Sequence, residues 1–120
     1  MYYKDMEVWK EAINLVTDIY RITEKFPDKE IYGIISQMRR CVISIPSNIA
    51  EGAVKHSDKD TLRFLDISLG SLAELDTQII IAKNLGYISD IDEIVIKISR
   101  VRALLTGLIK YYKSSLAEIS

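Results

Sequence analysis

Residues 37 to 52 read Gln37-Met38-Arg39-Arg40-Cys41-Val42-Ile43-Ser44-Ile45-Pro46-Ser47-Asn48-Ile49-Ala50-Glu51-Gly52. Apolar side chains recur along this stretch at helical intervals, and the interval is kept on both sides of Pro46. Proline lacks the N–H that a helix interior needs, and its ring crowds the carbonyl one turn earlier. The spacing therefore predicts one helix with a kink at Pro46. The alternative is a break near Ser44, with Pro46 as the first residue of a new helix.

The composition predicts a single domain over residues 1–120. A chain of this length can bury one core. Its 5 glycines and 2 prolines favour long helices with few turns over a many-stranded sheet. The net charge of −1 and the pI of about 5.8 argue against a general nucleic-acid coat, although they are compatible with a local basic patch.

The cysteine count and the distribution of apolar residues indicate the cellular compartment. Cys41 is the one cysteine, which rules out an internal disulfide and fits a reducing environment. No apolar run approaches the roughly 18 residues of a membrane helix, and the first residues do not resemble a signal peptide. We therefore expect a cytoplasmic protein that does not enter a membrane.

The first two helices are outlined by periodicity and by proline. The first is expected from Asp5, a candidate N-cap, to about residue 25, because Phe26-Pro27 disfavours helical geometry before it. The second is expected to start after Asp28, a further candidate cap.

The remaining two helices are outlined by capping signals. The third spans residues 57–85, with Ser57 and Asp60 as a capping pair at its start and a glycine after its end. The fourth opens with the same relation between Ser89 and Asp92. Short connections join antiparallel neighbours, so the predicted fold class is all-α, an up-down-up-down antiparallel four-helix bundle.

Several chemistries that helical bundles support are not indicated here. A di-iron site needs inward carboxylates and two Glu-x-x-His motifs, whereas this chain has one histidine, His56, and no such motif. Zinc spacings, phosphate-binding glycine loops and the Gly-x-Ser-x-Gly motif are missing from the sequence. We expect His56 in a solvated turn and Cys41 as a small buried hydrophobe. The prediction is a non-enzymatic protein with no catalytic residues, metal, cofactor or small-molecule substrate.

The first helix has a wider apolar face than one core contact requires. Its apolar arc is about 200°, and one core face needs a little over 100°. Val8, Leu15 and Ile22 carry the surplus at intervals of seven residues, which predicts a second seam.

The second helix carries a polar stripe opposite its apolar strip. The stripe consists of Gln37, Arg40, Ser44, Ser47, Asn48, Glu51 and Lys55. Gly33 and Gly52 lie on that side and would allow a neighbouring backbone to come close. One interpretation is a solvated face whose Ser44 and Asn48 satisfy backbone groups freed by Pro46. The other is a functional surface, either a subunit contact or a face that lines a pore. The subunit contact is the one that we predict. Together with the second seam, the predicted subunit contact would comprise Val8, Leu15, Ile22, Arg40, Ser44, Ser47, Asn48 and Glu51.

Two charged residues interrupt apolar faces. Asp76 lies within the apolar arc of the third helix, and Arg102 lies within that of the fourth. A buried carboxylate requires a partner, so we predict a buried ion pair between Asp76 and Arg102, with Arg39 or Arg40 as the alternative partner.

Basic residues form a candidate nucleic-acid patch around the second turn. They are Arg39, Lys55, Lys59 and Arg63. A solvated helix face is the simpler interpretation of such charges, and few aromatic side chains accompany them.

Several segments carry a family resemblance. They are Gln37-x-Arg39-Arg40, Ser44 to Gly52, Val8-Trp9-Lys10-Glu11-Ala12, Phe26-Pro27 through Tyr32-Gly33, and Arg63-Phe64-Leu65 through Gly70-Ser71-Leu72-Ala73-Glu74-Leu75 to Leu85-Gly86-Tyr87. The chain resembles the bacterial four-helix bundle proteins encoded in intervening sequences of large-subunit ribosomal RNA genes. It is also similar to the accessory bundle protein of diversity-generating retroelements.

The resemblance implies a four-helix bundle that assembles into a ring-like homopentamer. The retroelement relatives bind nucleic acid and a reverse transcriptase, and they are more basic than this chain. The first hypothesis is therefore a homo-oligomer that binds structured RNA or a nucleic-acid-handling protein. The alternative is a protein–protein scaffold without nucleic-acid affinity, which the acidic pI favours.

Overall fold

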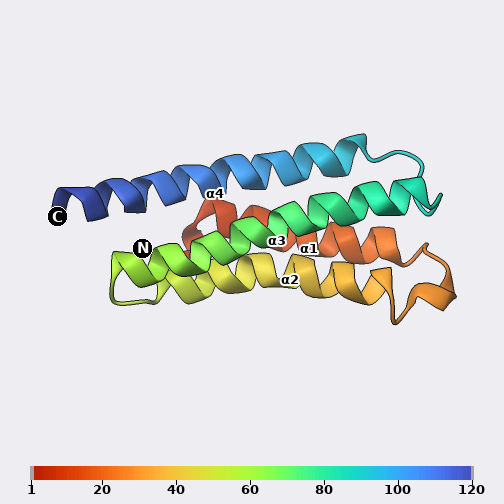
Figure 1. Ribbon diagram of the computed structural model, residues 1–120, viewed down its shortest axis with the longest axis horizontal. Helices are drawn as coiled ribbons and strands as arrows, with labels where there is room; N and C mark the ends of the chain where they lie inside the picture. Colours follow the sequence, from red (N-terminus) through yellow and green to blue (C-terminus); the bar gives the residue numbers. More distant parts are fainter. Residues whose placement is uncertain (1, 120) are drawn as a thin grey trace.

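The computed structural model describes residues 2–119, and the side chains of residues 2–117, as a bundle of four long helices (Figure 1). Successive helices run in opposite directions, which confirms the all-α, up-down-up-down prediction. The elements are η1 (Tyr3–Asp5), α1 (Glu7–Thr23), η2 (Asp28–Glu30), α2 (Ile34–Ala53), α3 (Asp58–Asn84) and α4 (Asp92–Ile119).

The four helices form a ring in which each one packs against two neighbours. Contacts join α1 to α2, α2 to α3, α3 to α4 and α4 back to α1. Each helix supplies fully buried side chains to the common core, among them Leu15, Ile45, Leu72 and Leu105. Burying one such side chain stabilises the fold by about 1.5–3 kcal/mol. The apolar periodicity that predicted the helices is therefore also what holds them together.

Helix α1 begins later than expected. Asp5 ends the short helix η1, and the N-cap of α1 is Met6, whose side chain makes no capping hydrogen bond. Met6 is buried at 7% exposure. Apolar packing of Met6, rather than a polar cap at Asp5, thus accompanies the start of the helix.

Helix α2 runs through Pro46 without interruption, so a new helix beginning at Pro46 is excluded. The kink stays a prediction. The helix starts at Ile34 rather than directly after Asp28, because Pro27 leads into the 3-10 helix η2 and a turn follows it. Ile31 lies in this turn and is 55% exposed.

The capping signals of the last two helices had different outcomes. The Ser57 hydroxyl accepts a hydrogen bond from the Asp60 amide at 3.2 Å, as predicted for α3. Gly86 follows α3 with φ of 80°, the left-handed conformation that glycine adopts without strain. Ser89 does not start α4. The amide of Asp92 instead donates to Asp90 Oδ1 at 3.0 Å, so that the Asp90 side chain organises the entry to the helix.

Helices α2 and α3 approach closely because small residues line their contact. A Cβ at Gly52 would lie 3.1 Å from the Thr61 carbonyl oxygen and 3.2 Å from Phe64 Cβ. The Thr61 hydroxyl donates to the Gly52 carbonyl at 2.8 Å, and the Ser68 hydroxyl donates to the Ile45 carbonyl at 2.9 Å. The close approach predicted at Gly52 is therefore met inside the chain.

Gly33 has a different role from the one expected. It is the N-cap of α2, and a Cβ there would meet the Glu30 carboxylate at 2.5 Å. Its neighbour is thus its own connecting segment, not another helix.

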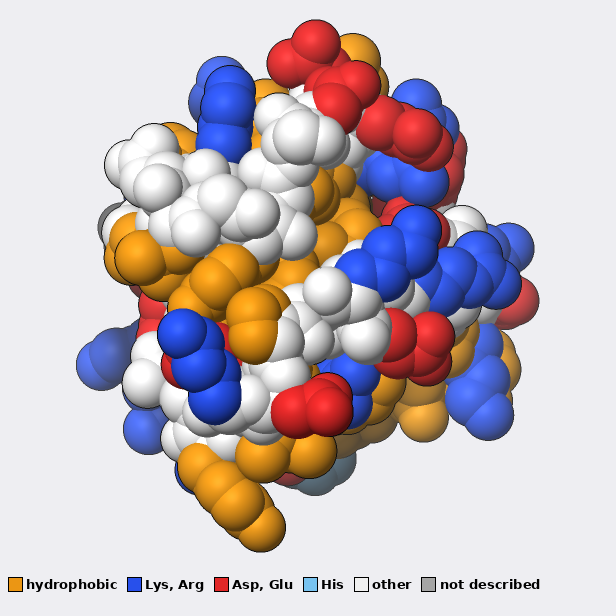
Figure 2. All heavy atoms as spheres, turned by 90° about the vertical axis from the view of Figure 1, so that its right-hand side faces the viewer, with side chains coloured by type: hydrophobic (Ala, Val, Ile, Leu, Met, Phe, Trp, Pro, Cys, Tyr) orange, Lys and Arg blue, Asp and Glu red, His pale blue; other side chains and the backbone are white. Residues whose placement is uncertain are grey.

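The two connections at one end of the bundle are tied together. The Tyr87 hydroxyl donates to Glu30 Oε2 at 2.7 Å, and the Tyr87 ring lies 5.5 Å from the Phe26 ring. Figure 2 views this end and shows acidic and basic side chains interspersed over it. No helix in the described part of the chain combines the length and apolar content of a membrane span.

Candidate interaction surfaces

His56 and Cys41 are the reactive side chains that the sequence analysis considered. Among the described residues, histidine, cysteine and acidic side chains form no group that could hold a metal ion. His56 is exposed in its turn, as expected. Cys41 is buried at 6% exposure, and its thiol donates to the Ser71 carbonyl at 3.0 Å. Burial, with a smaller contribution from the Glu74 carboxylate, raises the pKa of the Cys41 thiol to about 12, which keeps it protonated at neutral pH.

The polar stripe of α2 divides into an inner and an outer part. Ser44 is half-buried, and its hydroxyl is hydrogen-bonded to the Cys41 carbonyl and to the Ser71 hydroxyl, both at 2.6 Å. Asn48 is also half-buried and donates to the Ser44 carbonyl at 2.8 Å. Ser44 and Asn48 therefore make their hydrogen bonds within the chain.

The outer part of the stripe remains open to solvent. Arg40, Ser47 and Glu51 are exposed and follow one another at intervals of seven and four residues, on one face of α2. Of the stripe residues expected in a subunit contact, these three are the ones that a second molecule could reach.

The second seam expected on α1 is part of the core. Val8 is 5% exposed and Leu15 is 1% exposed, whereas Ile22 is half-buried against the core. The physical reason is the ring arrangement: α1 packs against both α2 and α4, so the chain itself covers the wide apolar arc. Val8 and Leu15 are not on an outer surface.

An apolar groove between α1 and α2 takes the place of that seam. It encloses about 310 Å³ and is lined by Tyr3, Trp9, Ile13, Val16, Ile43, Pro46, Ser47 and Ala50. Ile13 remains 39% exposed and Ile43 remains 42% exposed. Ser47 connects the groove to the outer part of the polar stripe. In the sequence, the signal was Ile43, which lies outside the apolar strip of the second helix.

The basic residues do not form one patch. Lys55 and Arg63 lie over the Phe64 ring, at 4.9 Å and 5.1 Å from its centroid, and Lys59 is exposed nearby on the first turn of α3. We call Lys55, Lys59 and Arg63 the basic cluster.

Arg39 is separate from the basic cluster. Its Nε donates to the Thr23 hydroxyl at 2.9 Å, and its guanidinium lies 4.5 Å from the Tyr20 ring centroid. It fastens α2 to α1. Its planar side chain is occupied by this half-buried contact within the chain, and its place in a nucleic-acid patch stays a prediction.

The ion pair between Asp76 and Arg102 is confirmed, with 3.4 Å between Oδ2 and Nη2. It is not buried, since its side chains keep 36% and 39% exposure. The prediction of burial failed because both residues lie at the edge of the apolar faces, where a long side chain reaches solvent.

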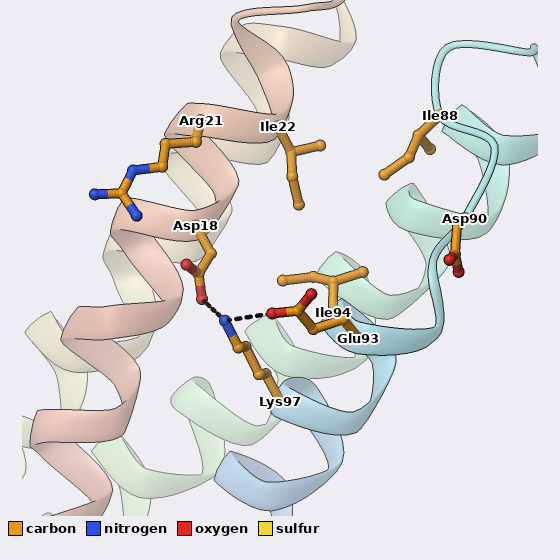
Figure 3. A pocket seen from close by; sticks show the side chains of 8 residues that line it. All are labelled: Asp18, Arg21, Ile22, Ile88, Asp90, Glu93, Ile94 and Lys97. Carbon is orange, nitrogen blue, oxygen red and sulfur yellow. Dashed lines mark hydrogen bonds and ion pairs between the residues drawn. The ribbon is translucent and has the colours of Figure 1, made fainter.

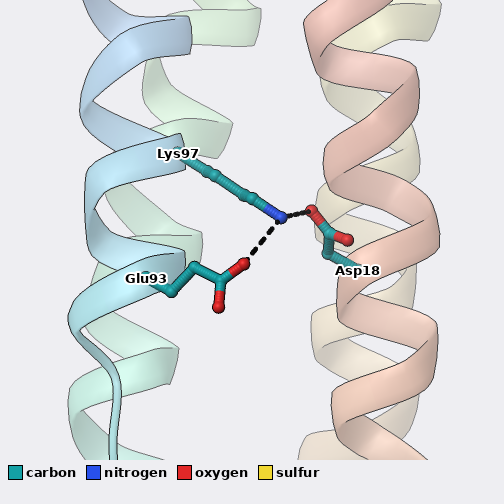
Figure 4. Close-up of polar contacts among 3 residues, drawn as sticks. All are labelled: Asp18, Glu93 and Lys97. Carbon is teal, nitrogen blue, oxygen red and sulfur yellow. Dashed lines mark hydrogen bonds and ion pairs between the residues drawn. The ribbon is translucent and has the colours of Figure 1, made fainter.

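A charged seam between α1 and α4 escaped the sequence analysis. Figure 3 shows the side chains of Asp18 and Lys97 in direct contact beside a cavity of about 220 Å³ that both help to line, while Arg21 extends away from Lys97. Lys97 Nζ lies 2.9 Å from Asp18 Oδ2 and 3.3 Å from Glu93 Oε1 (Figure 4). The hydrogen bond with Asp18 is the main reason that the pKa of Lys97 is raised.

The fold defines a small all-α protein, a bundle of four helices. The sequence model of the 23S rRNA-intervening sequence protein family matches residues 4–107, and the chain belongs to this family. The matched range runs from η1 through more than half of α4. No curated protein matches the chain.

Proposed function

We propose that this protein is a non-enzymatic homo-oligomer, assembled as a homopentamer, that binds structured RNA or a nucleic-acid-handling protein. The observation that carries the proposal is the apolar groove between α1 and α2. Its exposed Ile13 and Ile43 are flanked by the polar residues Arg40, Ser47 and Glu51. An apolar centre with a polar rim is the usual composition of a subunit interface.

A closed ring needs two different contact patches on each subunit. The groove would supply one of them. Ile67 and Ile81 on α3 are 46% and 44% exposed and lie two heptads apart, hence on one face of that helix. They are candidates for the second patch.

The assembly is tested by light scattering at micromolar concentration. We expect a multimer, with a mass of five times 13.7 kDa if it is the pentamer. Ile43→Glu places a charge in the groove and should release monomers. Ile96→Glu is the matched control, because Ile96 is 69% exposed on α4, outside the groove. A wild-type chain that is monomeric at this concentration contradicts the proposal.

RNA binding would centre on the basic cluster, since three cations gathered around one turn can contact phosphates. Phosphate contacts release counterions, so the affinity should fall steeply with salt. Lys59→Gln should lower the slope of log affinity against log salt by about 0.7–0.9. Lys83→Gln, an exposed lysine at the far end of α3, should leave the slope unchanged.

The alternative is a protein–protein scaffold without affinity for nucleic acid. The net charge of −1 favours it, and acidic Glu51 and Asp58 lie beside the basic cluster in the sequence. A multimer that binds no structured RNA even at low salt would support the scaffold over the RNA-binding protein.

A further inference from the structure

The seam between α1 and α4 closes the helix ring and is its sparsest helix–helix contact. Three cavities, of about 220, 320 and 480 Å³, are each lined by residues of both helices. These cavities open to solvent, so the side chains of α1 and α4 that line them make fewer dispersion contacts across the seam than close-packed interior side chains make. Apolar packing alone therefore holds this seam less firmly than the others.

Ion pairs bridge the seam where packing is thin. Arg100 contacts Glu7 at 2.6 Å and Glu11 at 3.2 Å. One turn of α4 away, Lys97 contacts Asp18 at 2.9 Å. Both cations belong to α4 and all three carboxylates belong to α1, so every pair attracts α4 toward α1. Figure 4 shows the Lys97 contact.

The other side of α1 is fastened differently. Arg39 of α2 is hydrogen-bonded to the Thr23 hydroxyl at 2.9 Å and stacked on the Tyr20 ring. Between α2 and α3, Thr61 and Ser68 donate to main-chain carbonyls at a close helix approach. Buried hydrogen bonds and ring contacts are screened by salt far less than exposed charges are.

We propose that the α1–α4 seam is the opening edge of the bundle, held shut by a salt-sensitive latch of Lys97 and Arg100 on Glu7, Glu11 and Asp18. When the latch is screened, α1 separates from α4 and exposes Leu15 and Ile94 to solvent, while α2 and α3 stay together. Added salt shortens the range of such attractions from about 10 Å at 0.1 M to about 3 Å at 1 M. All residues of the latch belong to one chain, so this proposal does not rest on the homo-oligomer or on RNA binding.

Thiol labelling of the full chain with a neutral reagent tests the latch. Ile94→Cys places a reporter at a seam position that is 4% exposed, and native Cys41 reports on the α2–α3 contact in the same molecule. Between about 0.1 M and about 1 M salt, labelling at position 94 should accelerate about threefold or more, whereas labelling at Cys41 should not. Leu15→Cys provides a second reporter on the α1 side if the first variant folds poorly.

Two substitutions on α4 distinguish a latch from a general salt effect. Arg100→Gln should raise the labelling rate at position 94 in low salt and reduce its salt dependence. Arg102→Gln removes the same charge two residues away, but from a pair with Asp76 on α3, and should change neither. Equal acceleration at position 94 and Cys41, no salt effect at position 94, or equal effects of the two substitutions would overturn the proposal.

Discussion

Gly52 determines how closely α2 and α3 can approach. The absent side chain leaves room for the carbonyl of Thr61, which lies 3.1 Å from the place of a Cβ. We predict that Gly52→Ala lowers the free energy of unfolding by about 1–3 kcal/mol, because the rigid α3 backbone must move away. Chemical denaturation followed by circular dichroism measures the change.

Gly70 is the matched control for Gly52. It lies inside α3, and a Cβ there would meet nothing within 4 Å. Gly70→Ala should therefore raise the stability by up to about 1 kcal/mol through helix propensity alone. Equal effects of the two alanine substitutions would mean that the close approach at Gly52 is not what limits α2 and α3.

Individual residues were predictable where periodicity determined their neighbours. Asp76 and Arg102 were paired correctly because an antiparallel hairpin with a short turn fixes which positions face each other. The contact of Arg39 with Tyr20 was missed, since a long arginine side chain can reach in several directions that spacing does not distinguish.

Among the elements, α2 shows that a continuous strip of buried apolar residues can keep a helix intact despite one proline in its interior. The strip of buried residues continues through Pro46 to Ile49 and Gly52, and the helix continues with it. The cost of a proline inside a helix is about 3 kcal/mol. Packing of the residues on both sides is thus the reason that the helix does not break.

Replacing Pro46 tests this balance. Pro46→Ala restores an amide that can bond to the carbonyl one turn earlier, and it removes part of a buried ring. We predict a net gain in unfolding free energy of about 1 kcal/mol, measured by denaturant titration. Pro27→Ala, in the connection before α2, should instead lose about 0.4–1 kcal/mol, because φ at Pro27 is already −58°. A loss at Pro46 would show that ring packing dominates there.

Helix starts were less predictable than helix existence. Asp5, Asp28 and Ser89 all have capping chemistry, yet none of them caps the helix that follows. Ser57 does. The difference is tertiary: burial of Met6 and the turn after η2 place the first turns of α1 and α2, and a sequence pattern alone does not contain these contacts.

At the scale of the whole molecule, one clamp joins the connection before α2 to the connection before α4. The Tyr87 hydroxyl donates to Glu30, and this hydrogen bond is the main cause that raises the pKa of Tyr87 above its ordinary value of 10.0. A raised pKa in the folded state means that the bond stabilises the fold fully below about pH 10. The contribution is lost as the pH rises through the folded-state pKa.

The clamp predicts a pH-dependent effect of Tyr87→Phe. The variant should melt at a lower temperature than the wild type near neutral pH, and the difference should shrink above about pH 10. The Phe26 ring contact is retained, so the comparison isolates the hydroxyl. Tyr32→Phe is the control, because Tyr32 is 95% exposed. A melting difference that is constant across this pH range would contradict the clamp.

The four-helix bundle could be predicted from the sequence. Which apolar residues are interior, and which charged residues pair across the bundle, could not. Periodicity identified which residues are apolar, and α1 packing against two neighbours decided that Val8 and Leu15 are interior. The latch pairs join residues that lie 79 and 93 positions apart. No local pattern relates such distant positions, so only the assembled bundle brings them together.

The order of the helices around the ring has a consequence for how the chain folds. Within the described residues, three helix contacts join consecutive helices, whereas the contact between α1 and α4 joins the two ends of the sequence. Local contacts need little loop-closure entropy, so we expect a low relative contact order and folding in the microsecond to millisecond range that is typical of helical bundles. The α2–α3 hairpin is the natural nucleus, and the α1–α4 contact is the last to form.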